Sequence, residues 1–204
     1  MPYFPFFSDI SDKQVLIIGG GKRALFKVER LLPFSPKIRV IYPEVKEEIC
    51  KLSHVSVEKR CPRKEDFSPE LLFVVAASED AEENRKVAEL CRSKHIPVNA
   101  VDYPEYCDFI FPSLITRGSL SIGISTGGAC PAVTSQLKEN IADLLPEITE
   151  ELLLWLENLT PALRRSIAED RERGRAIREL FSEGMRSGRV LTAEETDTIL
   201  QKYK

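Results

Sequence analysis

A short apolar segment that runs directly into a cluster of glycines constrains the fold of this chain more than any other feature. Residues 15–18 read Val-Leu-Ile-Ile, three glycines follow at once, and an apolar pattern with helical spacing begins at Ala24. Gly19, Gly21 and Ala24 match the pattern G-x-G-x-x-G/A, in which small residues permit a tight turn, a close approach of phosphate and close helix packing. We therefore predict that these residues form a turn that binds the pyrophosphate of a dinucleotide at the start of a helix.

The first half of the chain alternates between strand and helix patterns. Strands are expected at residues 15–18, 37–42, 55–59, 71–77 and 97–101, and helices at 23–32, 44–52 and 81–94. Ser78 is positioned to cap the helix at 81–94. This alternation predicts an α/β fold with a doubly wound, Rossmann-type parallel sheet and a ligand at the carboxyl ends of its strands.

After residue 108 the pattern changes. Two strands at 109–116 and 119–125 flank Arg117-Gly118, which indicates a hairpin, and a helical pattern then runs from Pro131 to Leu145. The rest of the chain has helical patterns. They cover residues 148–159, 162–181 and 193–201, with a break expected at Thr160-Pro161 and a capping box at Thr192–Glu195.

The composition is that of an ordinary globular protein. The 204 residues are 43% hydrophobic and 30% charged, with a formal net charge of -3. This charge provides no basic surface for nucleic acid, and no apolar run approaches the ~20 residues of a membrane span, so we expect neither partner. The N-terminus has no basic region of a secretion signal, which favours a cytoplasmic enzyme. Five scattered cysteines without a C-x-x-C pair, and two isolated histidines, lead us to expect no metal site.

Asp102 is the candidate catalytic residue. It follows the strand at 97–101, at the sheet edge where such folds bind ligands. Two interpretations stay open: Asp102 caps a turn before Pro104, or it is a general acid or base. Asn99, in the same strand, either binds the ribose or carboxamide of a cofactor or satisfies the strand end.

Further residues at strand ends are expected to line the dinucleotide. Tyr42 and Pro43 follow the second strand, and Ala77 and Ser78 follow the strand at 71–77. The acidic residue expected about 20 residues after the glycines has no clear counterpart, because Glu44 follows a proline.

Basic residues at the start of the first helix bear on whether the cofactor is NAD or NADP. Lys22 and Arg23 follow the glycines directly, and Lys27 lies one turn further on. These charges either favour the 2′-phosphate of NADP or are solvated helix charges, so the choice between NAD and NADP stays open on these residues.

A second glycine-containing turn lies between the hairpin and the next helix. Ser125, Thr126, Gly127 and Gly128 precede Pro131, which suits the first position of a helix. Free backbone N–H groups there would bind an anion, such as a substrate carboxylate. The alternative is an ordinary glycine-rich turn.

The order of these motifs resembles the precorrin-2 dehydrogenase / sirohydrochlorin ferrochelatase family, the dehydrogenase module of sirohaem synthases. The resemblance rests on the glycine turn at 19–24, Ala76–Asp80 with Asn84, Asn99–Asp102, Asp108–Ser113 and Ser125–Pro131. It implies an NAD-binding Rossmann domain at residues 1–112, a dimerisation region at 113–146 and a helical domain at 147–204. It also implies a homodimer that oxidises precorrin-2 to sirohydrochlorin with NAD, with Asp102 as the catalytic residue and Ser125–Gly128 near the tetrapyrrole.

Three points stay open at this stage. Some family members also insert iron, and the sequence does not decide whether this chain does. Because the chain ends at Lys204, the resemblance is to a stand-alone dehydrogenase without the methyltransferase module of fused sirohaem synthases. The alternative of a different class is a nucleotide-sensing Rossmann module that regulates a partner without catalysis.

Overall fold

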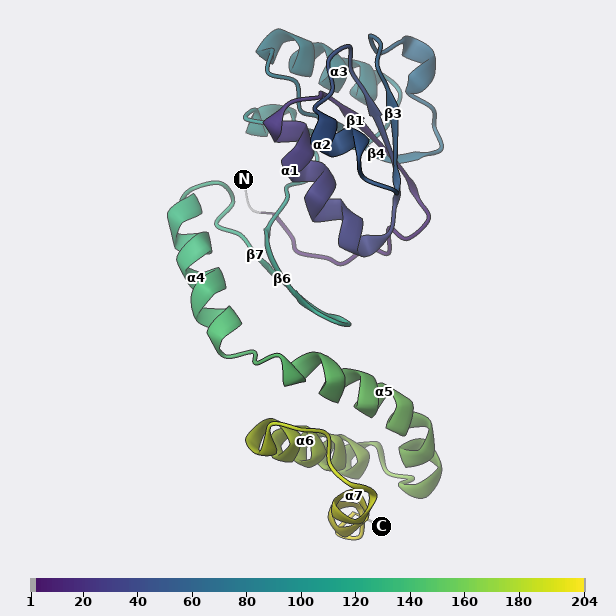
Figure 1. Ribbon diagram of the computed structural model, residues 1–204, viewed down its shortest axis with the longest axis vertical. Coiled ribbons are helices and arrows are strands. Elements are labelled where there is room, and N and C mark those ends of the chain that lie inside the picture. The colour runs from purple at the N-terminus through teal and green to yellow at the C-terminus, as the bar shows by residue number, and fades with distance from the viewer. Residues whose placement is uncertain (1–2, 204) are drawn as a thin grey trace. The chain divides into compact units, whose positions relative to one another are not determined.

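The structure is a computed structural model that describes residues 3–203. The chain divides into two compact units, Met1–Phe111 and Pro112–Lys204 (Figure 1). Each unit has its own sheet, and each is described separately below.

The first unit contains a parallel sheet with the strand order β3-β2-β1-β4-β5. The strands are β1 (Gln14–Ile18), β2 (Lys37–Ile41), β3 (Val55–Glu58), β4 (Leu71–Ala76) and β5 (Val98–Ala100). The chain moves outward from β1 to β3, and then returns to the other side of β1 with β4 and β5. The order therefore reverses between β1 and β4, which confirms the predicted doubly wound fold.

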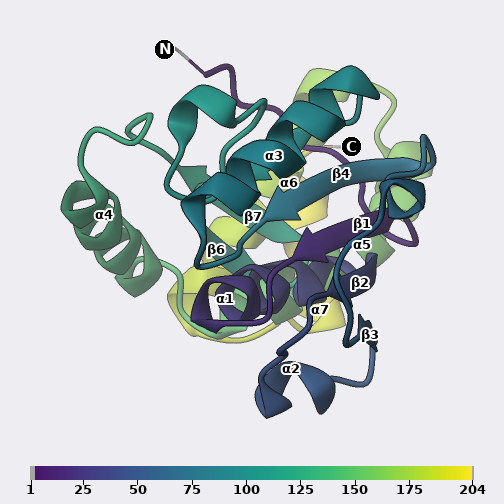
Figure 2. The ribbon, with the colours of Figure 1, turned by 90° about the horizontal axis from the view of Figure 1, so that it is seen from above.

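Helices cover both faces of this sheet. Apolar residues of α1 (Lys22–Leu31) and α2 (Glu47–Cys50) pack on one face, and those of α3 (Ala81–Ser93) pack on the other (Figure 2). The connections also contain short 3-10 helices, η1 (Leu32–Phe34), η2 (Lys64–Asp66) and η3 (Pro104–Tyr106). The two-sided cover explains why the sequence of β1 is apolar without alternation. Val15 and Ile17 pack against the α1 side, Leu16 and Ile18 pack against the α3 side, and all four are fully buried.

Two sequence predictions in this unit are corrected by the structure. The helix expected at 44–52 is limited to Glu47–Cys50. Ser78 does not cap α3, because the N-cap is Asp80, whose carboxylate accepts the Glu82 N–H at 2.9 Å. The Ser78 hydroxyl instead accepts the N–H of Asp80, the N-cap residue itself, at 3.1 Å.

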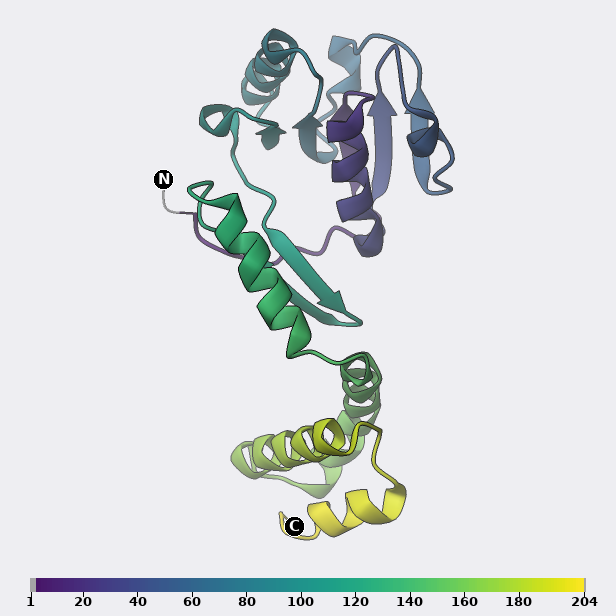
Figure 3. The same cartoon turned by 60° about the vertical axis from the view of Figure 1, so that its left-hand side comes forward.

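The second unit begins with an antiparallel hairpin and a helix that packs on it. The elements are β6 (Ser113–Arg117), β7 (Leu120–Ile124) and α4 (Pro131–Asp143), shown in Figure 3. Arg117 pairs with Leu120, so the two-residue turn is Gly118-Ser119, one residue later than predicted. Gly118 has a φ of 55°, a conformation that favours glycine in tight hairpin turns.

Three further helices complete the second unit: α5 (Ile148–Ser166), α6 (Asp170–Ser187) and α7 (Ala193–Leu200). The predicted break at Thr160-Pro161 is wrong, because α5 continues through Pro161 and ends only at Ser166. Leu156 and Leu163, on either side of the proline, are buried in one core with α6 and α7. This packing outweighs the cost of the missing proline N–H. The capping box predicted at Thr192 and Glu195 is confirmed.

Among residues 3–203, no helix is both long enough and apolar enough to cross a membrane.

Candidate functional site

The turn between β1 and α1 has the backbone that the glycine pattern predicts. Gly19 has a φ of 138°, and a Cβ there would lie 2.4 Å from the carbonyl oxygen of Ala77. Gly21 is the N-cap of α1 and has no side chain to cap it, and no acidic residue lies in the first helical turn. Ala24 is fully buried against the sheet. The N–H groups at this helix start are therefore not occupied by a side-chain cap and can donate to an anion.

Gly20, the middle glycine, is a residue that the motif leaves unspecified. A Cβ on Gly20 would lie 2.0 Å from the carbonyl oxygen of Glu44, and the carbonyl oxygen of Gly20 accepts the Lys46 N–H at 3.0 Å. The turn is thus packed directly under the loop that follows β2. The run of three consecutive glycines was the signal in the sequence for this close approach.

The other predicted cofactor residues follow the neighbouring strands. Tyr42 and Pro43 come directly after β2, and the Tyr42 hydroxyl lies 3.1 Å from the Ser78 hydroxyl after β4. Ala77 donates its N–H to the carbonyl oxygen of Ile18 at 2.7 Å, which extends the β1–β4 pairing by one residue. The structure thus brings the ends of β1, β2 and β4 together.

Asn84 of α3 holds the backbone of Ser78 in place. Its side-chain oxygen accepts the Ser78 N–H, and its side-chain nitrogen donates to the Ser78 carbonyl oxygen, both at 2.9 Å. Asn84 is fully buried, so this pair of hydrogen bonds is shielded from water. The sequence marked Asn84 within a motif but did not indicate this role.

Asp102 lies two residues beyond β5, in a turn closed by a hydrogen bond from the Tyr103 N–H to the Ala100 carbonyl oxygen. Its φ of 68° is left-handed, a conformation that aspartate tolerates better than most residues. The following 3-10 helix has Tyr103 as its N-cap and no side-chain capping bond. The interpretation of Asp102 as a cap before Pro104 is therefore wrong.

The carboxylate of Asp102 pairs with Arg23 of α1. The distance between Asp102 Oδ2 and Arg23 Nη2 is 2.6 Å. The same guanidinium lies 3.4 Å from a carboxylate oxygen of Glu79 and donates to the carbonyl oxygen of Ser78, also at 3.4 Å. Arg23 thus joins the candidate catalytic residue to the glycine turn. Lys22, the preceding residue, is the first residue of α1 and is exposed.

Lys27 lies one turn further along α1, in a partly desolvated environment. Its ammonium nitrogen is 4.1 Å from the centre of the Phe111 ring. Burial lowers the pKa of Lys27 to about 8, and Arg30 lowers it further, whereas Cys107 and Asp102 act in the opposite direction. Lys27 is therefore a partly buried cation that contacts Phe111, and not a freely solvated helix lysine.

Asn99 lies in β5 and is buried. Its side-chain nitrogen donates to the carbonyl oxygen of Phe109 at 2.9 Å and lies 3.4 Å from the Cys107 sulfur. Its side-chain oxygen has no partner within the described part of the chain. The donor side of Asn99 therefore stabilises the segment after β5, and the acceptor side is available to a donor.

The Ser125–Gly128 turn belongs to the second unit and joins β7 to α4. The Ser125 hydroxyl accepts the Gly127 N–H at 3.0 Å, and the Thr126 hydroxyl accepts the Cys130 N–H at 3.1 Å. Gly127 and Gly128 have φ values of 64° and 89°. The two hydroxyl residues thus satisfy two of the turn's N–H groups and hold the glycines in their left-handed conformation.

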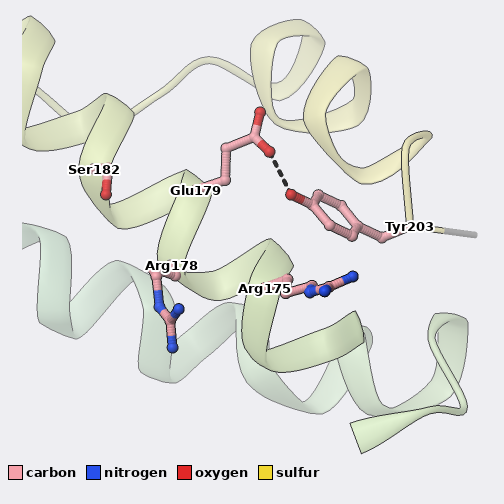
Figure 4. Close-up of a pocket in the computed structure, with 5 residues that line it drawn as sticks. All are labelled: Arg175, Arg178, Glu179, Ser182 and Tyr203. Atoms are coloured by element: carbon pink, nitrogen blue, oxygen red, sulfur yellow. Dashed lines mark hydrogen bonds between the residues drawn. The ribbon is translucent and has the colours of Figure 1, made fainter. Parts of the chain in front are cut away.

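A separate surface hollow lies in the helical part of the second unit and contains none of the predicted site residues. Arg175, Arg178, Glu179, Ser182 and Tyr203 line it (Figure 4). Glu179 pairs with Lys202 at 2.5 Å and accepts a hydrogen bond from Tyr203, and these contacts, with Lys202 the larger cause, keep the pKa of this carboxyl below its usual value. No group of three or more potential metal ligands occurs among residues 3–203.

The turn residues fit a dinucleotide. Gly19 and Gly21 have no side chains and the start of α1 is uncapped, which permits the close approach of a pyrophosphate. The Glu79 carboxylate lies beside this turn, with Oε1 2.7 Å from the position that a Cβ on Gly21 would take. Fold and site together define a Rossmann-type dinucleotide-binding protein. A family model described as Putative NAD(P)-binding matches residues 6–113, and the chain belongs to this family. A second model, described as Sirohaem biosynthesis protein central, matches residues 117–144.

Known relatives agree with the family resemblance. Siroheme synthase of Thioalkalivibrio sulfidiphilus is 34% identical over 202 residues, which cover 96% of this chain and 41% of that protein. Siroheme synthase of Neisseria meningitidis serogroup C is 36% identical over 150 residues, which cover 72% of this chain and 31% of that protein. The chain thus spans less than half the length of these relatives.

A solved structure shows the same fold along the whole chain. SirC, precorrin-2 dehydrogenase, superposes with a TM-score of 0.72 at 22% sequence identity, and the match covers 98% of both chains. The predicted order of a Rossmann sheet, a hairpin with a helix and further helices is therefore confirmed.

Proposed function

We propose that this protein oxidises precorrin-2 to sirohydrochlorin with NAD as hydride acceptor, in the biosynthesis of sirohaem. The observation that carries the proposal is the position of Asp102. Its carboxylate lies beyond the end of β5 and is linked through Arg23 to the dinucleotide turn. The names of the relatives and of the structural neighbour support the choice of substrate.

The chemistry divides between the cofactor and the chain. Removal of two hydrogens from the tetrapyrrole releases a hydride and a proton, and the bound NAD⁺ supplies the hydride acceptor. Asp102 accepts the proton, for which a carboxylate within hydrogen-bond reach of the substrate is needed. The remaining site residues bind and orient, which is the main contribution of the protein to such a reaction.

The binding roles follow from the positions of the residues. Gly19, Gly21, Lys22 and Ala24 are assigned to the dinucleotide through the start of α1, whereas Arg23, which we also expected there, pairs with Asp102. Tyr42, Pro43, Ala77, Ser78 and Asn99 are assigned to it through the strand ends. Ser125, Thr126, Gly127 and Gly128 are assigned to the substrate, because the start of α4 suits the carboxylates of the tetrapyrrole.

We include a homodimer in the proposal, formed through residues 113–146. Val133 and Leu137 of α4 are 45% and 42% exposed, although both are apolar and lie one helical turn apart. A second copy that packs on this helix would remove them from water. A cytoplasmic location is part of the same proposal, and the five free cysteines suit a reducing compartment.

The test is an anaerobic assay with enzymatically generated precorrin-2 and NAD⁺, followed by absorbance. We expect sirohydrochlorin and NADH to form in equal amounts. Addition of Fe²⁺ to the same cuvette then tests whether the protein also inserts iron. Binding of NAD⁺ without formation of either product would contradict the proposal and favour a nucleotide-sensing module.

Asp102→Asn tests the proton acceptor. Asparagine tolerates the left-handed backbone of this position, so the variant changes the chemistry and not the turn. We expect turnover to fall by about 10²-fold or more, with NAD⁺ binding retained. Asp197→Asn, on the exposed surface of α7, is the matched control and should have wild-type turnover. Unimpaired turnover of Asp102→Asn would remove this residue from the mechanism.

A further inference from the structure

Arg23 is held at three points, and each of its contacts uses a different nitrogen. Nη2 pairs with Asp102, Nη1 donates to the carbonyl oxygen of Ser78, and Nε faces the carboxylate of Glu79. A planar guanidinium with three partners in different directions has little freedom to rotate. The orientation of Arg23 is therefore set by its surroundings.

One of these contacts is itself rigid. The carbonyl oxygen of Ser78 belongs to the backbone that Asn84 holds with two hydrogen bonds of 2.9 Å. Asn84 and Ser78 are buried, so this anchor is part of the core of the first unit. A continuous path of polar contacts thus leads from the core through Arg23 to Asp102.

Asp102 has few other restraints. Its side chain is 57% exposed, and among residues 3–203 no other basic side chain forms an ion pair with it. A carboxylate in this position would sample several rotamers, whereas acid–base chemistry requires a defined geometry relative to the substrate. The contact with Arg23 supplies the missing restraint.

We propose that Arg23 is a positioning residue for Asp102, acting through that carboxylate and not as a ligand of the dinucleotide phosphates. This inference rests on the proposed dehydrogenation and deepens it, because the helix that starts at the dinucleotide turn would then also fix the orientation of the proton acceptor. The three contacts need the geometry of a guanidinium. A lysine at this position reaches one partner only and restores the function in part.

A double-mutant cycle tests the inference. Arg23→Met, Asp102→Asn and the double variant are compared for kcat, for the KM of precorrin-2 and for the dissociation constant of NAD⁺ from calorimetry. We expect Arg23→Met to lower kcat about tenfold or more and to change the NAD⁺ dissociation constant by less than about threefold. In the Asp102→Asn background the same change should lower kcat by less than about twofold, because the two residues act as a unit. Arg23→Lys should lie between wild type and Arg23→Met.

A role of Arg23 in binding the cofactor would give a different result in the same measurements. If Arg23 binds the pyrophosphate, its loss weakens NAD⁺ binding about tenfold or more, and its effect on turnover multiplies with that of Asp102→Asn. That outcome overturns the inference. Arg30→Met is the matched control, because Arg30 lies on the same helix, is half-buried and stacks on the Phe26 ring instead of a carboxylate. It should have wild-type kcat and NAD⁺ affinity.

A second measurement separates this inference from the proposed function. If the wild-type protein shows no turnover, the proposed function fails, and the same four proteins are compared by chemical denaturation together with NAD⁺ binding. A coupling of about two- to fivefold in the unfolding equilibrium constant, with unchanged NAD⁺ affinity, supports the pairing of Arg23 with Asp102. Additive unfolding constants overturn it.

Discussion

Gly20 lies so close to the carbonyl oxygen of Glu44 that a Cβ on the glycine would be 2.0 Å from that oxygen. The partner is backbone, so a side chain at position 20 must move the loop after β2. We predict that Gly20→Ala destabilises the protein by about 1–3 kcal/mol and weakens NAD⁺ binding. Urea denaturation and calorimetry measure the two effects. Wild-type stability and affinity in this variant would show that the loop adapts without cost.

Two glycines of α6 provide a matched pair. A Cβ at Gly174 meets nothing within 4 Å, whereas a Cβ at Gly184 would lie 2.4 Å from Leu152 Cδ2 in the core. Gly174→Ala should stabilise the helix by roughly 0.5–1 kcal/mol, because alanine has the higher helix propensity. Gly184→Ala should lose that gain to the displacement of buried Leu152 and be less stable than Gly174→Ala by about 1–3 kcal/mol. Thermal denaturation that ranks the two variants equally would contradict this packing.

Asp66 is expected to make the stability of the first unit fall at low pH. It is buried, its oxygens accept hydrogen bonds from Arg60 at 2.6 and 2.8 Å, and the backbone N–H of Arg63 donates to it at 2.7 Å. These contacts, with the hydrogen bonds from Arg60 the largest cause, lower the pKa of Asp66 to about 2. Because the pKa is lowered on folding, the stabilisation is complete above pH ~4 and is lost as the pH falls towards 2.

Asp66→Asn measures this contribution. We expect a loss of about 2 kcal/mol in the free energy of unfolding at pH 7, and a smaller difference from wild type at pH 3. Denaturant titrations at the two pH values provide the comparison, with Asp197→Asn as an exposed control. A difference that does not depend on pH would show that the ionised form of Asp66 is not stabilised.

Folding destabilises the charged form of Lys27, whereas it stabilises the charged form of Asp66. Burial lowers its pKa to about 8, so at neutral pH the folded protein must hold an ammonium that the unfolded chain solvates more favourably. Replacement by methionine keeps the apolar stem against Phe111 and removes the charge. We predict that Lys27→Met stabilises the protein at pH 7 by about 1 kcal/mol, a value reduced for partial exposure and for the loss of the cation–π contact.

The sign of the pH effect follows from linkage. Between pH 8 and the ordinary lysine pKa of about 10.4 the unfolded chain binds more protons, so wild-type stability gains from this residue as the pH rises. The advantage of Lys27→Met should therefore shrink between pH 7 and pH 10 in urea denaturation. Lys86→Met, an exposed lysine on α3, is the control and should change stability little at either pH. A constant advantage of Lys27→Met would refute the assigned pKa.

The cysteines should differ in reactivity according to burial. Cys50, Cys61 and Cys130 are exposed, whereas Cys91 is buried and its pKa is raised to about 12 by desolvation. Because the thiolate is the reactive form, iodoacetamide at pH 8 should modify the three exposed cysteines and should not modify Cys91 until the protein unfolds. Mass spectrometry of peptides after timed labelling checks this. Labelling of Cys91 at the rate of Cys50 in the folded protein would contradict the core described for α3.

Local sequence patterns predicted most elements of this protein and their order. The strand at β1, the turn at Gly19 and the capping box at Thr192 each have a signal within a short segment of sequence, namely an apolar run, a glycine pattern and Thr-x-x-Glu. The two-sided burial of β1 could be read from its unbroken apolar run, because a half-exposed strand would alternate. The placement of Asp102 at the ligand edge follows from the same strand pattern.

Tertiary structure alone decided which residues meet. Arg23 reaches Asp102 only because β5 is brought beside β4 on the same side of β1, and Gly20 needs its missing side chain only because the loop at Glu44 crosses it. Pro161 remains inside α5 because the leucines on both sides are buried against α6 and α7. In each case the structure is decided by packing or charge interactions between segments distant in the chain. Local propensities do not include these interactions, so they cannot predict them.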